Sequence, residues 1–119
     1  MFMKKILIVD DDLVVLHSLY LILIRDYRVE GLSDDKQALN RIRENSYDLI
    51  ITDLFLNEIT GLDLYWAAKD KEKVIIITAY PEKELALKAK SLLGDRFIPK
   101  STPPEILKSK VASILEGKI

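Results

Sequence analysis

The stretch KILIVDDDL, residues 5–13, runs four apolar residues directly into three adjacent aspartates. A continuous run rich in Ile and Val is typical of a strand that is covered on both faces, as the strands of a parallel sheet are. Three neighbouring carboxylates repel one another, so a folded chain needs a reason to crowd them. We therefore expect a positive partner at the end of this strand.

Outward from this stretch, apolar runs alternate with segments of helical character. The apolar runs are residues 5–9, 27–32, 48–52, 73–78 and 96–99, and the helical segments are residues 13–25, 34–45, 61–71, 82–93 and 104–116. Run 27–32 is more polar than the others and is expected to be an edge strand. The alternation predicts an α/β fold with a parallel sheet and helices on both of its faces. In such sheets ligands bind beyond the carboxyl ends of the strands, so the residues that end each strand are the candidate site residues.

The composition is that of an ordinary globular domain, with 49% apolar and 31% charged residues in a chain of 119. The formal net charge is −1, and no run of Lys or Arg stands out, which argues against direct nucleic-acid binding by this segment. The chain has no cysteine and a single histidine, His17, so thiolate sites and multi-histidine metal sites are excluded. No signal peptide is expected, because residues 1–5 lead directly into a short apolar strand, and the most apolar stretch, 13–24, is too short to cross a membrane. We expect a cytoplasmic protein without a membrane partner.

Several residues are expected to set helix ends. Asp12 should cap the N-terminus of helix 13–25 and not bind a ligand. The sequence TPPE, residues 102–105, predicts a capping box at the start of the last helix, with prolines in its first turn. Gly94 and Gly117 are expected to end the fourth and fifth helices.

Polar side chains gather at the ends of the predicted strands. Asp10 and Asp11 follow the first strand, Asp53 the third, Thr78 ends the fourth and Lys100 follows the fifth. Carboxylates suit Mg²⁺, which often shares its coordination shell with a phosphoryl group. A hydroxyl and an ammonium can hold that anion, and a carboxylate can act as a nucleophile towards phosphorus.

This ordered set resembles the receiver domain of two-component response regulators, and the resemblance covers essentially all of residues 1–119 as one domain. It rests on the acidic pair after the first strand, Asp53, Gly61, Thr78-Ala79, Lys100 after Phe97, and the spacing of 22 residues from Thr78 to Lys100. The resemblance implies a CheY-like, flavodoxin-like fold, with a five-stranded doubly wound parallel sheet in the order 2-1-3-4-5 and five helices.

The resemblance also implies residue roles. Asp53 would be the phosphoacceptor, taking a phosphoryl group from a histidine kinase or a histidine phosphotransfer protein. Asp11 would bind Mg²⁺ directly, Asp10 mostly through a water, and Asp53 and the main-chain carbonyl of Phe55 would complete the protein ligands.

Two further residues, Thr78 and Lys100, would hold phosphoryl oxygens, and Thr78 and Phe97 would be switch residues that move on phosphorylation. The domain would not be an enzyme. It would be a signalling domain that catalyses its own phosphorylation and dephosphorylation. A homodimer and an effector domain are further partners that the family allows.

The chain departs from the family pattern at three places near the expected site. Asn57 stands where the family usually has proline, which should leave the following loop less rigid. Ser101 follows Lys100 where proline with a cis bond is common. A cis bond before a non-proline residue costs about 3 kcal/mol, which favours trans here. The segment from Asp53 to Thr78 is a few residues shorter than usual, which predicts a clipped third helix or connection.

Two bulky residues, Phe55 and Tyr80, are expected at the rim of the site, where they would shield the phosphoryl group from attacking water. Lys83, Lys88 and Lys90 are expected to form a solvated face of the fourth helix, and His17 to be a surface or partly buried residue without a phosphodonor role.

The first helix is unusually apolar, because ten of its twelve residues from Leu13 to Ile24 are hydrophobic. A helix on one face of a sheet buries only a stripe, so some of Val14, Tyr20, Leu21 and Ile24 should be exposed. The resemblance places a kinase-docking surface on this helix.

Two alternatives remain open at this stage. In a haloacid-dehalogenase-like phosphatase, Asp10 would be the nucleophile and Asp12 the general acid, although Asp53 would then have no role. In a pseudo-receiver, the same fold would serve as an interaction module without phosphorylation.

Overall fold

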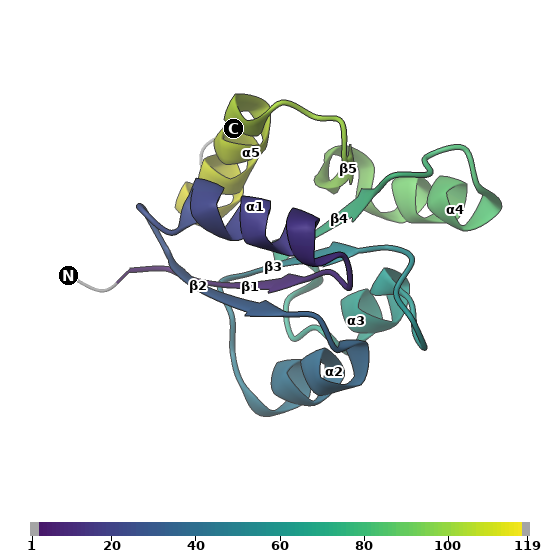
Figure 1. Ribbon diagram of the computed structural model, residues 1–119, viewed down its shortest axis with the longest axis horizontal. Helices are drawn as coiled ribbons and strands as arrows, with labels where there is room; N and C mark the ends of the chain where they lie inside the picture. Colours follow the sequence, from purple (N-terminus) through teal and green to yellow (C-terminus); the bar gives the residue numbers. More distant parts are fainter. Residues whose placement is uncertain (1–2, 118–119) are drawn as a thin grey trace.

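Five parallel strands form one sheet in the order β2-β1-β3-β4-β5 in the computed structural model, which describes residues 3–117 (Figure 1). The elements are β1 (Lys5–Val9), α1 (Leu13–Leu23), β2 (Arg28–Leu32), α2 (Asp35–Glu44), β3 (Leu49–Asp53), α3 (Gly61–Ala67), the 3₁₀ turn η1 (Lys71–Lys73), β4 (Val74–Thr78), α4 (Glu84–Leu93), the 3₁₀ turn η2 (Gly94–Arg96), β5 (Phe97–Pro99) and α5 (Pro104–Glu116). This order confirms the predicted doubly wound α/β fold.

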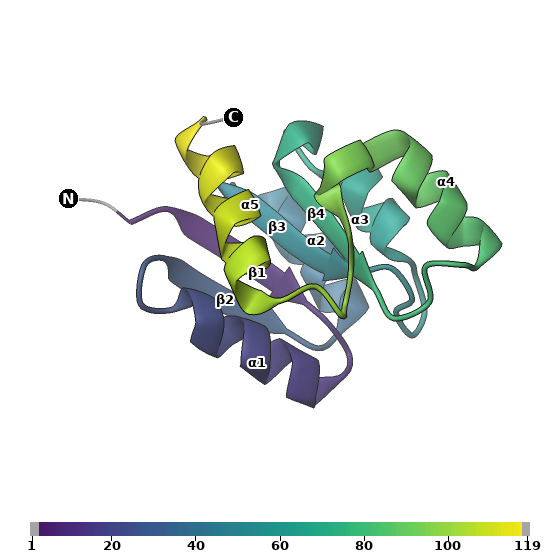
Figure 2. The same cartoon turned by 90° about the horizontal axis from the view of Figure 1, so that it is seen from above.

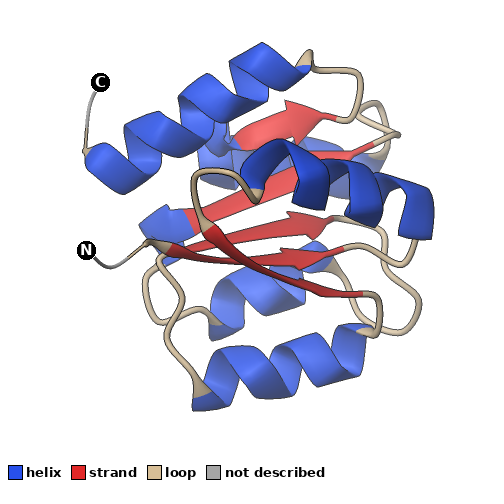
Figure 3. Cartoon of the chain, turned by 60° about the vertical axis from the view of Figure 1, so that its left-hand side comes forward, coloured by secondary structure: helices blue, strands red, loops and turns tan. Residues whose placement is uncertain are grey.

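Helices cover both faces of the sheet, α1 and α5 on one and α2, α3 and α4 on the other (Figures 2 and 3). Each face has its own apolar core, because successive side chains of a strand point in opposite directions. Ile6 and Ile8 of β1 pack towards α1 and α5, whereas Leu7 and Val9 pack towards the other three helices. The central strands β3 and β4 are buried along their whole length, while β2 is partly exposed, as an edge strand should be.

The strand register brings the polar strand ends together. Val9 lies opposite Thr52, so Asp10 and Asp53 leave the sheet side by side. Asp53 in turn lies opposite Ile77, next to Thr78, and Thr78 lies opposite Pro99, which precedes Lys100. The parallel register therefore gathers these side chains at one edge of the sheet.

Three of the predicted helix ends are confirmed. The Asp12 carboxylate accepts hydrogen bonds from Val14 N at 3.0 Å and Val15 N at 3.4 Å. Gly94 and Gly117 end α4 and α5 with φ of 58° and 66°, a region that glycine enters without steric cost.

The predicted capping box of the last helix is wrong. Pro103 is the N-cap of α5 and provides no side-chain hydrogen bond. Because the residue before a proline is pushed out of the helical region, Pro103 adopts an extended conformation ahead of Pro104. Thr102 is left in the preceding turn, where its N–H donates to Pro99 O at 3.0 Å.

Four helices are shorter than predicted, α1 and α2 by two residues each, and α3 and α4 as follows. Helix α3 ends at Ala67 and not at residue 71, because Ala68 turns extended and Asp70 caps the short turn η1. This shortening agrees with the clipped third helix that the short spacing predicts. Helix α4 begins at Glu84 and not at residue 82.

The outer face of α1 exposes large apolar side chains. Of the candidates named from the sequence, Val14 and Leu21 are 76% and 55% exposed, and Leu13 adds to them, while Tyr20 and Ile24 are half-buried. His17 is exposed, as expected. Among the helices of residues 3–117, none combines the length and apolar character needed to cross a membrane.

Candidate functional site

Three carboxylates meet at the carboxyl edge of the sheet. Asp10, Asp11 and Asp53 each offer an oxygen atom within 4.8 Å of the others. Asp10 and Asp53 are buried, and Asp11 is exposed at the mouth of the cluster. Asp10 is held in place because its Oδ1 accepts a hydrogen bond from Asp12 N at 2.9 Å. The three aspartates predicted as metal ligands are therefore brought together.

Lys100 supplies a positive charge inside this cluster. Its Nζ lies 3.0 Å from Asp10 Oδ2 and 3.3 Å from Asp53 Oδ2. Its own N–H donates to Thr78 O at 2.8 Å, which fixes the base of the lysine to the end of β4. One lysine thus links the ends of β1, β3 and β4.

The charges of the cluster are not balanced by Lys100 alone. Burial, followed by the charge of Asp10, raises the pKa of Asp53 to about 6 in spite of Lys100. Burial also raises the pKa of Asp10. Burial alone would lower the pKa of Lys100, but its contacts with Asp10 and Asp53 outweigh this and raise it. A further cation would therefore reduce the repulsion between the buried carboxylates of Asp10 and Asp53.

The donor set fits a hard divalent cation. Asp10 Oδ2 is buried and has only the ion pair with Lys100, without a hydrogen bond of good geometry from any described residue. This buried carboxylate oxygen, together with the carboxylates of Asp53 and the exposed Asp11, matches the oxygen ligands that Mg²⁺ prefers. Asp10, Asp11 and Asp53 are the side chains that could hold it.

Thr78 is fully buried at the end of β4. Its Oγ1 accepts a hydrogen bond from Tyr80 N at 3.0 Å, so its side chain faces the β4–α4 loop that begins there. Phe97, by contrast, does not lie among the charged residues. It is buried in the core next to α4, and its switch role stays a prediction.

The loop after Asp53 is closed at its base. Gly61 N donates to Leu54 O at 2.8 Å, and Phe55 and Thr60 form an isolated antiparallel bridge. Gly61 approaches the main chain so closely that a Cβ atom there would lie 2.5 Å from Asp53 O. Phe55, whose carbonyl was predicted to bind metal, is thus tied to the first turn of α3.

The two aromatic residues expected to shield the site, Phe55 and Tyr80, contact each other, and their shielding role stays a prediction. The rings of Phe55 and Tyr80 meet edge to face with centroids 6.1 Å apart. Lys83 Nζ lies 5.4 Å from the centroid of Phe55 and 4.8 Å from that of Tyr80, within the range of a cation–π contact. Lys83 is exposed, as expected, but it precedes α4, and its place over the two rings was not predicted.

Two predictions about neighbouring residues are also settled. The Lys100–Ser101 peptide bond is trans, because the described chain contains no cis bond. Asp12 lies next to the cluster but turns its carboxylate to the N-terminus of α1. This cap leaves Asp12 poorly placed for the general-acid role that the phosphatase alternative gives it.

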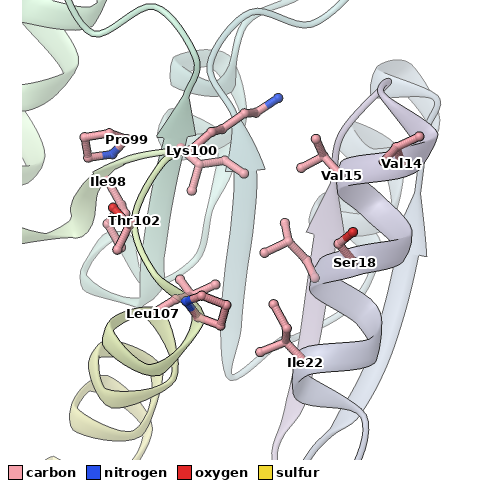
Figure 4. Close-up of a pocket in the computed structure, with 12 residues that line it drawn as sticks. Val14, Val15, Ser18, Ile22, Ile98, Pro99, Lys100, Thr102 and Leu107 are labelled. Carbon is pink, nitrogen blue, oxygen red and sulfur yellow. The ribbon is translucent and has the colours of Figure 1, made fainter.

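A separate apolar groove of about 290 Å³ opens between α1 and the segment from β5 to α5 (Figure 4). Val15, Ser18 and Ile22 line it from α1, and Leu107 lines it from α5. Lys100 lies at one end and extends its ammonium away from the apolar walls. The apolar groove and the charged site therefore adjoin each other at Lys100.

Comparison with known proteins places this geometry in context. Residues 6–112 match the model of the family described as response regulator receiver domain. The transcriptional regulatory protein YdfI of Bacillus subtilis is 31% identical over 98% of this chain and 57% of its own length. The two-component response regulator PhoP of Pseudomonas aeruginosa is 28% identical over 93% of this chain and 51% of its own length. The chain thus spans about half the length of the curated relatives it matches.

Solved structures of receiver domains and response regulators share the fold of this chain. A CheY-like receiver domain protein from Methanospirillum hungatei superposes with a TM-score of 0.84 at 29% identity, over 98% of this chain and 96% of that one. The response regulator protein TrrA from Thermotoga maritima, solved in complex with Mg(2+)-BeF, superposes with a TM-score of 0.79 at 30% identity. That alignment covers 95% of this chain and all of TrrA.

Proposed function

This chain belongs to the family of response regulator receiver domains, and we propose that Asp53 is its phosphoacceptor. The phosphodonor would be a histidine kinase or a histidine phosphotransfer protein. The observation that carries this assignment is the position of Asp53, which is buried between two other carboxylates and the ammonium of Lys100.

In the transfer step, a carboxylate oxygen of Asp53 forms a bond to phosphorus while the bond from phosphorus to the donor's imidazole nitrogen breaks. The imidazole leaves as a neutral ring after taking up a proton from water. Lys100 neutralises charge on the transferred group, and the hydroxyl of Thr78 can move to bind one of its oxygens. Transfer of this kind depends on positioning and charge neutralisation more than on further covalent chemistry.

Asp10, Asp11 and Asp53 would hold Mg²⁺ through side-chain oxygens, and Phe55 would add its main-chain carbonyl. Bound there, the ion would neutralise the phosphoryl oxygens and the crowded carboxylates together. The Asp10 oxygen without a hydrogen bond supports this assignment.

Phosphorylation would act as a switch by adding negative charge beside Thr78 and Lys100. Movement of Thr78 would pull on the β4–α4 loop, because Tyr80 N is bonded to its hydroxyl. Phe97 is already buried, so its switch role would be a shift within the core beside α4. A partner kinase would dock over α1, whose exposed Val14 and Leu21 offer an apolar surface.

The assignment is tested by treating the protein with acetyl phosphate and Mg²⁺ and mapping the modified residue by mass spectrometry. We expect modification at Asp53 and none without Mg²⁺. Modification at Asp10 would instead favour the phosphatase-like alternative. No modification, together with no binding of beryllofluoride, would indicate a pseudo-receiver that serves only as an interaction module.

A second prediction concerns the aromatic rim. Phe55→Asn and Tyr80→Ala should each shorten the lifetime of the phosphorylated protein by about three- to tenfold, because the edge-to-face pair would no longer exclude water from the phosphoryl group. The measurement is the loss of phosphoryl label over time after the donor is removed.

Trp66→Ala is the matched control, since Trp66 is 54% exposed and Tyr80 50%, but Trp66 pairs with Tyr65 on α3. The control should leave the lifetime unchanged. Equal lifetimes in the wild type and both rim variants would rule out the shielding role.

A further inference from the structure

A buried carboxylate outside the charged site holds the loop that follows Asp53. Asp35 begins α2 and is only 5% exposed. Its Oδ2 accepts two hydrogen bonds, from Glu58 N at 2.6 Å and Ile59 N at 3.0 Å. Both donors lie at the tip of the loop between β3 and α3. In the sequence, Asp35 is marked only as a second aspartate directly after Asp34.

The role of Asp35 differs from that of its neighbour. Asp34 caps α2, because its Oδ1 accepts from Lys36 N at 3.0 Å and Gln37 N at 3.2 Å. The helix therefore has its cap without Asp35, and the second carboxylate is directed across to another element. Burial alone would raise the pKa of Asp35, but the bonds from Glu58 N and Ile59 N outweigh it and lower the pKa, so the carboxylate is held in its charged form.

The loop carries this restraint to the site. Its base is closed by the bond from Gly61 N to Leu54 O, and the bridge between Phe55 and Thr60 joins its two arms. A loop with paired arms moves as one body, so displacing its tip also displaces Phe55. The ion pair of Lys36 with Glu58, at 2.7 Å, also reaches the tip, but both side chains are exposed and such pairs contribute little.

We propose that Asp35 is a positioning residue that fixes the loop of residues 54–61 and, through it, the main chain of Phe55 beside Asp53. The part that concerns Mg²⁺ and phosphoryl transfer rests on the proposed function, whereas the part that concerns the loop does not. The loop has Asn57 where a proline would restrict the main chain, and Asp35 provides the restriction from outside.

The test compares Asp35→Ala and Asp35→Asn with Asp34→Ala. Hydrogen exchange of the amides of residues 54–60 reports on the loop, and calorimetric titration with Mg²⁺ reports on the site. Asp35→Ala should raise exchange at Glu58 and Ile59 and weaken Mg²⁺ binding by about tenfold, the lower end of the loss that follows removal of a supporting residue at metal sites.

Asp35→Asn should fall between the wild type and Asp35→Ala, because both bonds go to one oxygen, which an amide can supply without the charge. Asp34→Ala removes a helix cap and should lower overall stability, yet leave loop exchange and Mg²⁺ affinity unchanged. A merely structural role of Asp35 would give the same pattern as Asp34→Ala.

Exchange at Glu58 and Ile59 that is unchanged in Asp35→Ala would overturn the proposal. Faster exchange with unaltered Mg²⁺ affinity would overturn the claim that Asp35 supports the metal site, because loosening the loop would then not affect Mg²⁺ binding. If the wild type itself bound no Mg²⁺, the proposed function would fail, and the amide exchange would still decide whether Asp35 fixes the loop.

Discussion

Asp53→Asn is expected to abolish phosphorylation and, at the same time, to stabilise the metal-free protein. Labelling by acetyl phosphate should fall by at least about 100-fold, because a neutral amide is a poor nucleophile. The free energy of unfolding at neutral pH should rise by about 1 to 3 kcal/mol, because burial and the charge of Asp10 disfavour the ionised carboxyl in the folded state.

The stability gain should depend on pH in a defined direction. The pKa of Asp53 rises from its ordinary value of 3.8 to about 6 on folding. The folded state thus favours the protonated carboxyl, a contribution that is fully present below the unfolded pKa and lost as pH rises through about 6. Asn mimics the protonated form at every pH. The advantage of the variant should therefore be small at about pH 4, grow as pH rises, and be complete only well above about pH 6.

Urea denaturation in the presence of a chelator, at both pH values, measures this difference. Asp26→Asn, at an exposed position, changes the net charge by the same amount and should have little effect. If Asp53→Asn were less stable than the wild type at neutral pH, the prediction would be wrong. The ionised carboxylate of Asp53 would then stabilise the metal-free folded state.

Gly61→Ala is expected to destabilise the protein by about 2 to 4 kcal/mol and to slow phosphorylation. The added Cβ would lie 2.5 Å from Asp53 O and 3.1 Å from Leu54 Cα, so the main chain itself would have to move. Gly61 does not have a positive φ, so steric contact and not backbone strain is the cause. Thermal and urea denaturation measure the loss of stability, and the initial rate of labelling measures the effect on Asp53.

Gly31→Ala provides the control, because the Cβ there would meet only the flexible end of Leu16, at 3.2 Å. It should change stability by less than about 1 kcal/mol. Equal stability of the two variants would mean that the loop can move away from β3 at little cost. The bond from Gly61 N to Leu54 O and the bridge between Phe55 and Thr60 predict the opposite.

Much of the fold and of the charged site could be predicted because both depend on short local patterns. The run ILIV before Asp10 and the run before Asp53 indicate buried parallel strands, and parallel strands place their carboxyl ends together. Asp12 could be recognised as a cap because the signal and its partner lie within three residues.

The parts that were missed depend on contacts between elements. Asp35 and its partners Glu58 and Ile59 are more than twenty positions apart, and nothing in the local sequence marks them as neighbours. Lys83 was placed with the solvated lysines because its exposure follows the pattern, while its position over two rings depends on the path of a loop. The false capping box arose because Pro103, held extended ahead of Pro104, is the N-cap in place of Thr102.

The register of β1, β3, β4 and β5 also has a consequence for the order of folding. Lys100 reaches Asp53 across 47 positions of the chain, and its main chain is bonded to the end of β4. Non-local strand pairings form late, since the entropy of closing long loops must be lost first. The complete site therefore exists only when β5 has joined the sheet. Competence for phosphorylation should therefore require the pairing of β5 with β4, and a chain in which β5 is unpaired should not accept the phosphoryl group.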